Sequence, residues 1–170
     1  LVLSPNYVQA KLDMFLIYGT LGRTGEAEAI RNELSSVFSV DLIKLLDTYL
    51  VYWGGEEEAA IASLDKLANS QEIPANYKGV SYLAFGENEK AFSFFQTAAD
   101  QDDPYVGEMM LTQARVLSRE HWQSIKKTAK FMSFMKRFGY DDTWPAELEN
   151  RANSITDFTK VTVRAKGGLE

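Results

Sequence analysis

The sequence predicts an all-α protein built as a stack of about four helical hairpins. Three observations predict this fold. The dipeptides Leu21-Gly22, Trp53-Gly54 and Phe85-Gly86 lie 32 residues apart. An alanine follows each glycine by five residues, and a large apolar residue precedes each dipeptide by three. Such a pattern, kept over three periods, is typical of stacked helical repeats.

Each period is predicted to hold two helices with a glycine turn between them. The first helix begins at Ser4-Pro5, an N-cap residue followed by proline at the first helical position, and runs to about Tyr18. Thr24 is predicted to cap the next helix, whose first turn carries Glu26 near the positive end of the helix dipole. Apolar residues then recur at helical spacing to about Phe38.

The later hairpins follow the same plan. The second begins near Asp41 and is broken by Gly54-Gly55, and the third begins at Pro74 and turns at Gly86. Asp103-Pro104 repeats the cap-plus-proline start and is predicted to open a fourth hairpin. Its last helix is expected over about residues 118–138, longer and more basic than the others.

The pattern ends beyond Gly139, so we expect one helical-repeat domain over residues 1–150 and a polar tail over 151–170 that frays. The sequence starts without methionine and ends in Leu169-Glu170, which resembles an expression-vector remnant. We therefore interpret it as a piece of a longer protein.

The third period resembles a tetratricopeptide repeat. Its Gly79, Tyr82, Gly86, Ala91, Phe95, Ala98 and Pro104 follow that family's order of small residue, tyrosine, turn glycine, alanine, aromatic, alanine and proline. The first two periods depart from it, with Phe15 and Asp47 at the small place and Arg31 and Ser63 at the aromatic place. The resemblance covers about residues 5–138 and implies a right-handed superhelix. The residues to which we assign structural signature roles are Tyr18, Gly22, Ala27, Gly54, Ala59, Tyr82, Gly86, Ala91 and Pro104.

A second resemblance concerns the last hairpin. The run from Ala129 to Tyr140, with Trp144 after it, is similar to the ending of repeat domains attached to bacterial adenylate cyclases and winged-helix transcription activators. In those proteins an acidic-proline exit, here Asp102-Asp103-Pro104, precedes such an ending. The resemblance implies a regulatory C-terminal module of a bacterial signalling or transcription protein.

Composition and charge narrow the function classes. The 170 residues are 45% hydrophobic and 25% charged, which is ordinary for a globular protein. No apolar run approaches the roughly 20 residues that span a bilayer. Residues 1–118 hold 8 Lys/Arg against 17 Asp/Glu, whereas residues 119–137 hold 6 against 1. Because the body is acidic, direct nucleic-acid binding by this fragment is not expected.

Few residues suit catalysis. The absence of cysteine excludes disulfides, thiolate nucleophiles and cysteine metal sites. His121 is the only histidine, and we interpret it as a surface or capping residue. The acidic runs 56–58 and 100–103 could bind a hard cation, but helix-start electrostatics explains the first run. The sequence thus predicts no enzyme, no metal and no cofactor.

The last helix is predicted to be amphipathic. Its basic residues are Lys126, Lys127, Lys130, Lys136 and Arg137, and its apolar ones include Phe131, Met132, Phe134, Met135 and Phe138. The simpler interpretation is an apolar side facing a core with a solvated basic back. The alternative is docking of the basic side on an acidic surface of this chain or a sister subunit.

The resemblance also implies a concave groove lined by the first helix of each hairpin. Carried over by register, the groove residues would be Leu12, Leu16, Lys44, Thr48, Tyr52, Asn76 and Val80. Leucine, valine and tyrosine with a few polar groups suit an apolar helix or an extended peptide. Closure of this groove by the tail or by dimerisation is the alternative.

The sequence therefore favours a non-catalytic protein–protein interaction module, with a protein or peptide as partner and homodimerisation left open. A small-molecule-sensing regulatory domain and an envelope assembly scaffold are the alternatives. The compartment also stays open: we favour the cytoplasm, or the periplasm if the chain is attached to a membrane-bound regulator.

Overall fold

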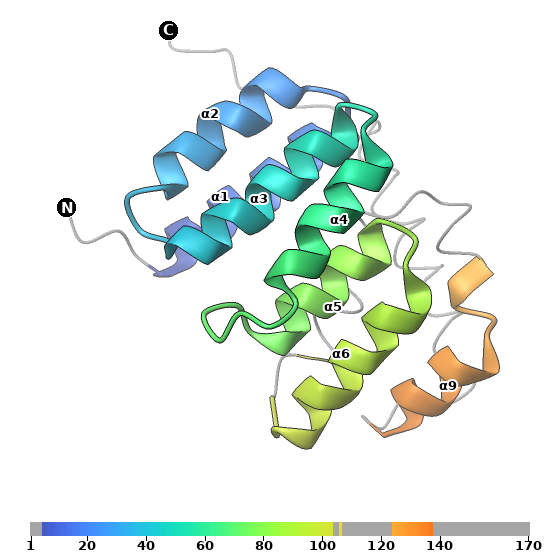
Figure 1. Ribbon diagram of the computed structural model, residues 1–170. Coiled ribbons are helices and arrows are strands. Elements are labelled where there is room, and N and C mark those ends of the chain that lie inside the picture. Colours follow the sequence, from blue (N-terminus) through green and yellow to red (C-terminus); the bar gives the residue numbers. More distant parts are fainter. Residues whose placement is uncertain (1–4, 104–105, 107–123, 138–170) are drawn as a thin grey trace, which may run out of the picture. The chain divides into compact units, whose positions relative to one another are not determined.

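The computed structural model of the chain describes residues 5–103, 106 and 124–137, and its regular structure within these ranges is entirely helical (Figure 1). The all-α class is confirmed for this part of the chain. Its helices are α1 (Pro5–Thr20), α2 (Thr24–Leu34), α3 (Val40–Trp53), α4 (Glu57–Leu67), α5 (Ala75–Ala84), α6 (Asn88–Asp100) and α9 (Ala129–Lys136). Among these described helices none has the length and apolarity needed to cross a bilayer.

The chain divides into two compact units, residues 1–125 and residues 126–170. The predicted tail over 151–170, the proposed domain end at residue 150 and Pro104 lie outside the described residues. The predicted fourth hairpin also lies outside the described residues, apart from residue 106 and residues 124–137.

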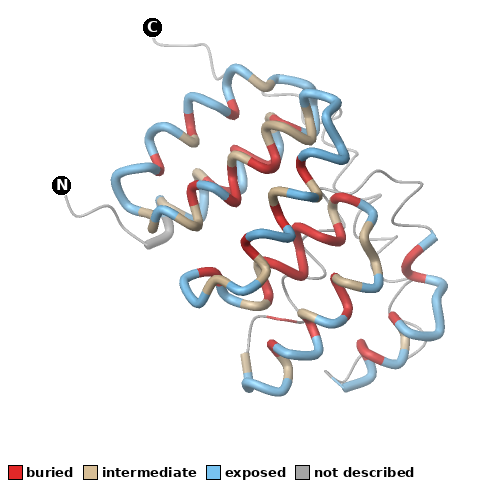
Figure 2. The backbone as a smooth tube through the Cα atoms, in the orientation of Figure 1, coloured by how far each residue is buried: buried red, intermediate tan, exposed pale blue. Residues whose placement is uncertain are grey.

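The first unit repeats one arrangement three times. Consecutive helices pair as hairpins, α1 with α2, α3 with α4 and α5 with α6, and each hairpin packs on the next through α2 with α3 and α4 with α5. Buried positions recur along each helix, and the other faces are exposed except in α5, whose residues are all buried or intermediate (Figure 2). The described part of this unit is therefore a helical-repeat architecture.

The same turn closes all three hairpins. Gly22, Gly55 and Gly86 have φ of 72°, 89° and 82°, in the left-handed region that glycine enters without steric cost. In each turn the amide of the next residue donates to a carbonyl five residues back, as from Arg23 to Tyr18 and from Glu87 to Tyr82, both at 2.9 Å. These are Schellman closures of the first helix of each pair.

The second hairpin corrects the predicted register by one residue. Its left-handed turn residue is Gly55, whereas Gly54 keeps a helical φ of −71°. Five residues after Gly55, Ala60 is fully buried, while the predicted signature residue Ala59 is exposed. The repeat spacing in the structure is thus 33 and then 31 residues, because the chain uses the second glycine of a Gly-Gly pair.

The third hairpin packs most closely. A Cβ placed on Gly79 would lie 2.8 Å from the Phe95 ring and 3.2 Å from the Ala91 carbonyl oxygen. Ala91, Phe95 and Tyr82 are all buried. Here a small residue is required by space, since the second helix of the hairpin crosses directly over it.

In the first hairpin, the place of Gly79 is held by Phe15, seven residues before its turn glycine. Phe15 is fully buried, and its ring lies 6.2 Å from Tyr49 and 5.1 Å from Trp53, centroid to centroid. The Trp53 ring in turn occupies the space beside Gly19, where a Cβ would overlap it. Phe15 therefore joins the first hairpin to the second through an aromatic cluster.

Two predicted helix starts are different in the structure. Thr24 is the first residue of α2, and the capping position is Arg23, which makes no side-chain cap hydrogen bond. The predicted continuous helix over 118–138 is broken by a turn at 126–128, where the Thr128 side chain accepts a hydrogen bond from the Phe131 amide and starts α9. A threonine that satisfies a free helical amide favours a new start at that point.

Candidate functional site

Five of the seven predicted groove residues are buried: Leu12, Leu16, Thr48, Asn76 and Val80. Leu12 and Leu16 each expose 7%, and Thr48 only 2%. The Thr48 hydroxyl donates to the Leu45 carbonyl oxygen of its own helix at 2.7 Å. In the described structure these five side chains are therefore largely withdrawn from solvent.

Lys44 and Tyr52 are the two predicted groove residues that remain accessible. Lys44 donates to Asp41 on its own helix at 2.9 Å. The Tyr52 ring stacks on Phe85 with centroids 4.4 Å apart. The α3 residues of the predicted groove do not share one face with Leu12, Leu16 and Val80, because the one-residue shift rotates α3 relative to the predicted face.

In the corrected register, Leu45 and Tyr49 occupy the α3 positions predicted for Lys44 and Thr48, and both are buried. The Tyr49 ring contacts Phe15, Trp53 and Phe85, so it joins α3 to α1 and to the residue that follows α5. Burial raises the pKa of the Tyr49 hydroxyl, and a hydrogen bond with Ser81 opposes part of that increase. The inner faces of α1, α3 and α5, which are the first helices of the three hairpins, consequently form an apolar, aromatic core.

A cleft of about 600 Å³ lies along α3 and α4. It is lined by Asp41, Lys44, Asp47, Thr48, Val51, Ser63, Lys66, Leu67, Asn69 and Ser70. Lys44 and Thr48 of the predicted groove therefore border this separate cleft. Its volume falls in the range of roughly 300–1,000 Å³ that is usual for small-ligand sites.

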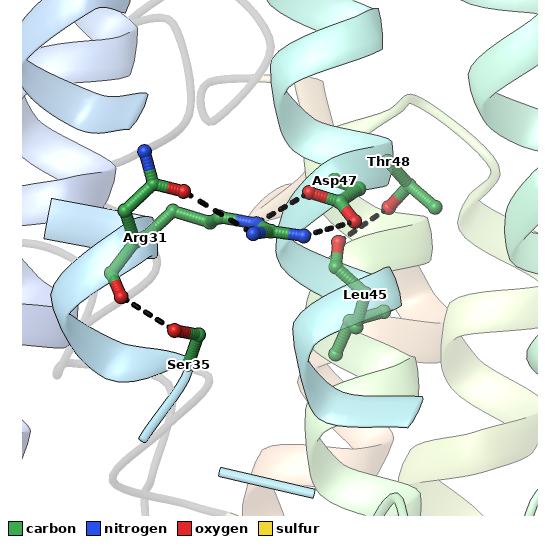
Figure 3. Close-up of polar contacts among 6 residues, drawn as sticks. Arg31, Ser35, Leu45, Asp47 and Thr48 are labelled. Carbon is green, nitrogen blue, oxygen red and sulfur yellow. Dashed lines mark hydrogen bonds and ion pairs between the residues drawn. The ribbon is translucent and has the colours of Figure 1, made fainter. Parts of the chain in front are cut away.

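The carboxylates of the cleft are already engaged. Asp41 accepts hydrogen bonds from Lys44 at 2.9 Å and from the Ser70 hydroxyl at 2.6 Å, and these lower its pKa. Asp47 accepts two hydrogen bonds from Arg31, Nε to Oδ1 at 2.6 Å and Nη2 to Oδ2 at 2.7 Å. Figure 3 shows Arg31 reaching from α2 across to Asp47 on α3.

The bidentate Arg31–Asp47 pair explains one departure from the repeat pattern. Arg31 stands four residues after Ala27, where the third hairpin has Phe95 four residues after Ala91. Its hydrogen bonds to Asp47 raise the pKa of the guanidinium. The pair links consecutive hairpins by a directional contact where the third hairpin uses an internal aromatic contact.

A further surface was not identified from the sequence. Three of the six large apolar side chains that are exposed in the described residues lie on one face of α1, Tyr7 (45% exposed), Met14 (43%) and Ile17 (52%), and a fourth, Leu21 (65%), follows directly after the helix ends. Ala10, also exposed, lies between them on the same face. We call Tyr7, Ala10, Met14, Ile17 and Leu21 the α1 stripe. The i, i+3, i+7 spacing that reveals it is present in the sequence.

In the second unit, α9 is amphipathic over the residues that the structure describes, as the sequence predicts. Phe131, Phe134 and Met135 are buried, whereas the basic side chains of Lys127, Lys130, Lys136 and Arg137 are exposed. Lys126 departs from this pattern because it is buried. Phe138 and His121 lie outside the described residues. No cluster of three or more potential metal-binding side chains occurs in the described part of the chain.

The fold and these surfaces define an all-α protein of repeated helical hairpins with an exposed apolar helix face. Comparison with known proteins adds no narrower class: no family model, no curated protein and no solved structure matches this chain.

Proposed function

We propose that this chain is a non-catalytic protein–protein interaction module of tetratricopeptide-like type, acting as the regulatory C-terminal part of a bacterial signalling or transcription regulator. The α1 stripe is the observation that carries the binding role. Monomeric proteins seldom expose a contiguous row of large apolar side chains, and such rows mark surfaces that meet another protein.

The closely packed third hairpin supports the tetratricopeptide-like type, since Gly79, Ala91 and Phe95 meet where that family's small, alanine and aromatic residues would. The regulatory setting rests on the resemblance of the sequence from Ala129 onward. The binding surface in this proposal is the α1 stripe in place of the predicted groove, because most groove residues are buried.

The test is affinity capture from bacterial lysate to which an untagged copy of the chain is added. The bait is the parent protein, the stripe variant Met14→Glu/Ile17→Glu, or the control Val40→Glu. Val40 is 69% exposed and lies on α3, off the stripe. We expect the parent and the control to retain at least one protein, and the stripe variant to lose it. Equal retention by a correctly folded stripe variant would remove the α1 stripe as the binding surface.

A second candidate function is small-molecule sensing, which the cleft along α3 and α4 favours by its volume and by its apolar surface with charged and hydroxyl side chains along it. A compound of this kind would raise the melting temperature of the parent. It would have no such effect on Lys66→Glu/Ser63→Tyr, which changes the charge and fills the cleft. A compound that stabilises both proteins equally would bind elsewhere.

A further inference from the structure

We propose that the cleft along α3 and α4 binds a small organic anion, a carboxylate with an apolar body, through the ammonium groups of Lys44 and Lys66. The proposal rests on the second candidate function, small-molecule sensing, and names the class of ligand. Three observations support it: the reason that the cleft exists, the pair of residues that the repeat places on its two helices, and the state of the charges that line it.

The cleft exists because the second hairpin lacks an aromatic pair that the third hairpin has. In the third hairpin, Tyr82 and Phe94 lie four residues before and eight residues after the left-handed turn glycine, and their rings stack with centroids 5.4 Å apart. Counted from Gly55, the same two places hold Val51 and Ser63, which both line the cleft. Two smaller side chains thus leave open the space that two rings fill in the third hairpin.

The repeat also places two like charges on the two helices of the cleft. In the first hairpin, Lys11 and Glu33 lie eleven residues before and eleven residues after the turn glycine, and they form an ion pair between α1 and α2. The same places of the second hairpin hold Lys44 on α3 and Lys66 on α4, both exposed and both lining the cleft. Two ammonium groups therefore stand where the first hairpin has a cation and its counterion, and a bound anion would supply the counterion.

The carboxylates that line the cleft do not neutralise both ammonium groups. Asp47 is held by Arg31 from α2 through two hydrogen bonds, as Figure 3 shows. Asp41 accepts hydrogen bonds from Lys44 and from a serine hydroxyl. Lys66 makes no ion pair or hydrogen bond within the described residues. With Arg31 counted, three cationic groups meet two carboxylates at the cleft, so one positive charge is left for a ligand.

The chemistry of the lining defines the ligand. An ammonium group has three N–H donors and no acceptor, and Lys44 already donates to Asp41. The remaining donors of the two lysines suit a carboxylate, whose oxygens accept charge-assisted hydrogen bonds. Val51 and Leu67 add apolar surface beside these donors, and the cleft of about 600 Å³ has room for a hydrocarbon or aromatic body. Because both lysines are exposed, the attraction is screened by solvent and should weaken with added salt.

NMR titration of the intact, ¹⁵N-labelled protein with 3-phenylpropionate tests the proposal. The amide of this acid, 3-phenylpropionamide, is the neutral probe of matched shape, and inorganic phosphate is the anion without an apolar body. We expect 3-phenylpropionate to shift the backbone amide signals of Val51, Ser63 and Lys66. It should bind about fivefold or more tightly than the neutral amide, as one partly exposed ion pair allows, and more tightly than phosphate.

Lys66→Glu is the decisive variant, because it gives the second hairpin the lysine–glutamate order of the first. It should keep or raise the melting temperature of the ligand-free protein, and it should weaken 3-phenylpropionate binding by about tenfold or more, since attraction is replaced by repulsion. The control Lys127→Glu makes the same change of charge at an exposed lysine that does not line the cleft. The control should bind 3-phenylpropionate as the parent does.

Undiminished binding by a folded Lys66→Glu variant, or no shift of the cleft signals by 3-phenylpropionate, would overturn the proposal. Equal loss of binding in both lysine variants would overturn it too, because net charge alone would then explain the effect. If the acid and its amide shift the cleft signals with equal affinity, small-molecule sensing survives and only the preference for an anion is wrong. Small-molecule sensing itself fails if every compound that stabilises the parent stabilises Lys66→Glu/Ser63→Tyr equally.

Discussion

The first and third hairpins place opposite residues at equivalent positions. Gly79 leaves room for α6 to cross α5 directly, whereas Phe15 fills the same position of α1 and reaches Tyr49 and Trp53 on the next hairpin. Phe95 packs inside the third hairpin, whereas Arg31 points outward from the first to Asp47. The third hairpin thus places these side chains inside itself, whereas the first, whose α1 and α2 also pack on each other, directs Phe15 and Arg31 to its neighbour.

This difference shows that the repeat turn and the repeat packing are separable. All three turns have the same backbone geometry, with a left-handed glycine and a Schellman hydrogen bond. The residues between the turns differ, and they decide whether the large side chains of a hairpin pack inside it or against the next hairpin. The first hairpin stacks on the second through one side, and the α1 stripe on its other side is exposed.

The largest effect is expected at the Phe15/Gly79 pair of positions. Phe15→Ala removes a fully buried ring and should lower the free energy of unfolding by about 3–5 kcal/mol. The opposite change, Gly79→Ala, should also destabilise, since its Cβ would overlap the Phe95 ring. Urea unfolding measures both. The adjacent exposed change Met14→Ala is the control, and a Phe15→Ala loss as small as that control would contradict the assignment of Phe15 to the core.

A smaller effect is expected from the alanines that follow the turns. Ala60→Leu and Ala91→Leu should each cost about 1–3 kcal/mol, because both replace fully buried alanines at helix crossings. Ala59→Leu should change the free energy of unfolding by less than about 0.5 kcal/mol, since Ala59 is exposed. Thermal or urea unfolding of the three variants decides the register of the second hairpin. A larger loss in the free energy of unfolding for Ala59→Leu than for Ala60→Leu would instead support the predicted 32-residue spacing.

Tyr49 links the second and third hairpins and should add a pH dependence. Tyr49→Phe should cost about 0.5–1.5 kcal/mol at pH 7 through the lost hydrogen bond with Ser81. Burial raises the folded-state pKa of Tyr49, so its contribution to stability is present below the unfolded value of about 10 and is lost as pH rises above it. Unfolding curves between neutral pH and about pH 11 should therefore fall less steeply for Tyr49→Phe than for the parent. Parallel curves would mean that Tyr49 ionises equally in both states.

The smallest effect is expected for the Arg31–Asp47 pair, whose side chains are 24% and 43% exposed. A double-mutant cycle with Arg31→Ala and Asp47→Ala should give a coupling of about 0.2–1 kcal/mol that weakens with added salt. Phe95→Ala, at the equivalent position of the third hairpin, should cost several times more because a fully buried ring is removed. Equal losses in the free energy of unfolding for Arg31→Ala and Phe95→Ala would contradict the difference between the two hairpins.

The sequence predicted the described helices and turns well where one residue alone could satisfy a requirement. Gly86, Ala91 and Gly79 each meet a demand of φ or of space that other residues cannot meet. The second hairpin was displaced because Gly54-Gly55 offers two glycines, and a strict 32-residue period selects the wrong one. The break before α9 was missed because Thr128 interrupts an otherwise continuous amphipathic pattern.

The predicted groove could not be placed reliably from sequence for a different reason. Apolar residues such as Leu16 and Val80 suit a binding groove and a packed core equally, and only the three-dimensional contacts distinguish the two. The one-residue shift then moved Lys44 and Thr48 to a separate cleft. The α1 stripe could have been found from its spacing, but exposure is a property of the stack and cannot be read from one helix.

Lys78 has a consequence for the chemical reactivity of the chain. Its buried ammonium group donates to the Ala68 and Ser70 carbonyl oxygens, and burial lowers its pKa. An acylating reagent reaches such an amine only when the junction between α4 and α5 opens, whereas the exposed Lys44 and Lys66 are attacked directly. The rate at which Lys78 is acylated, relative to those two lysines, therefore reports how often the second hairpin separates from the third.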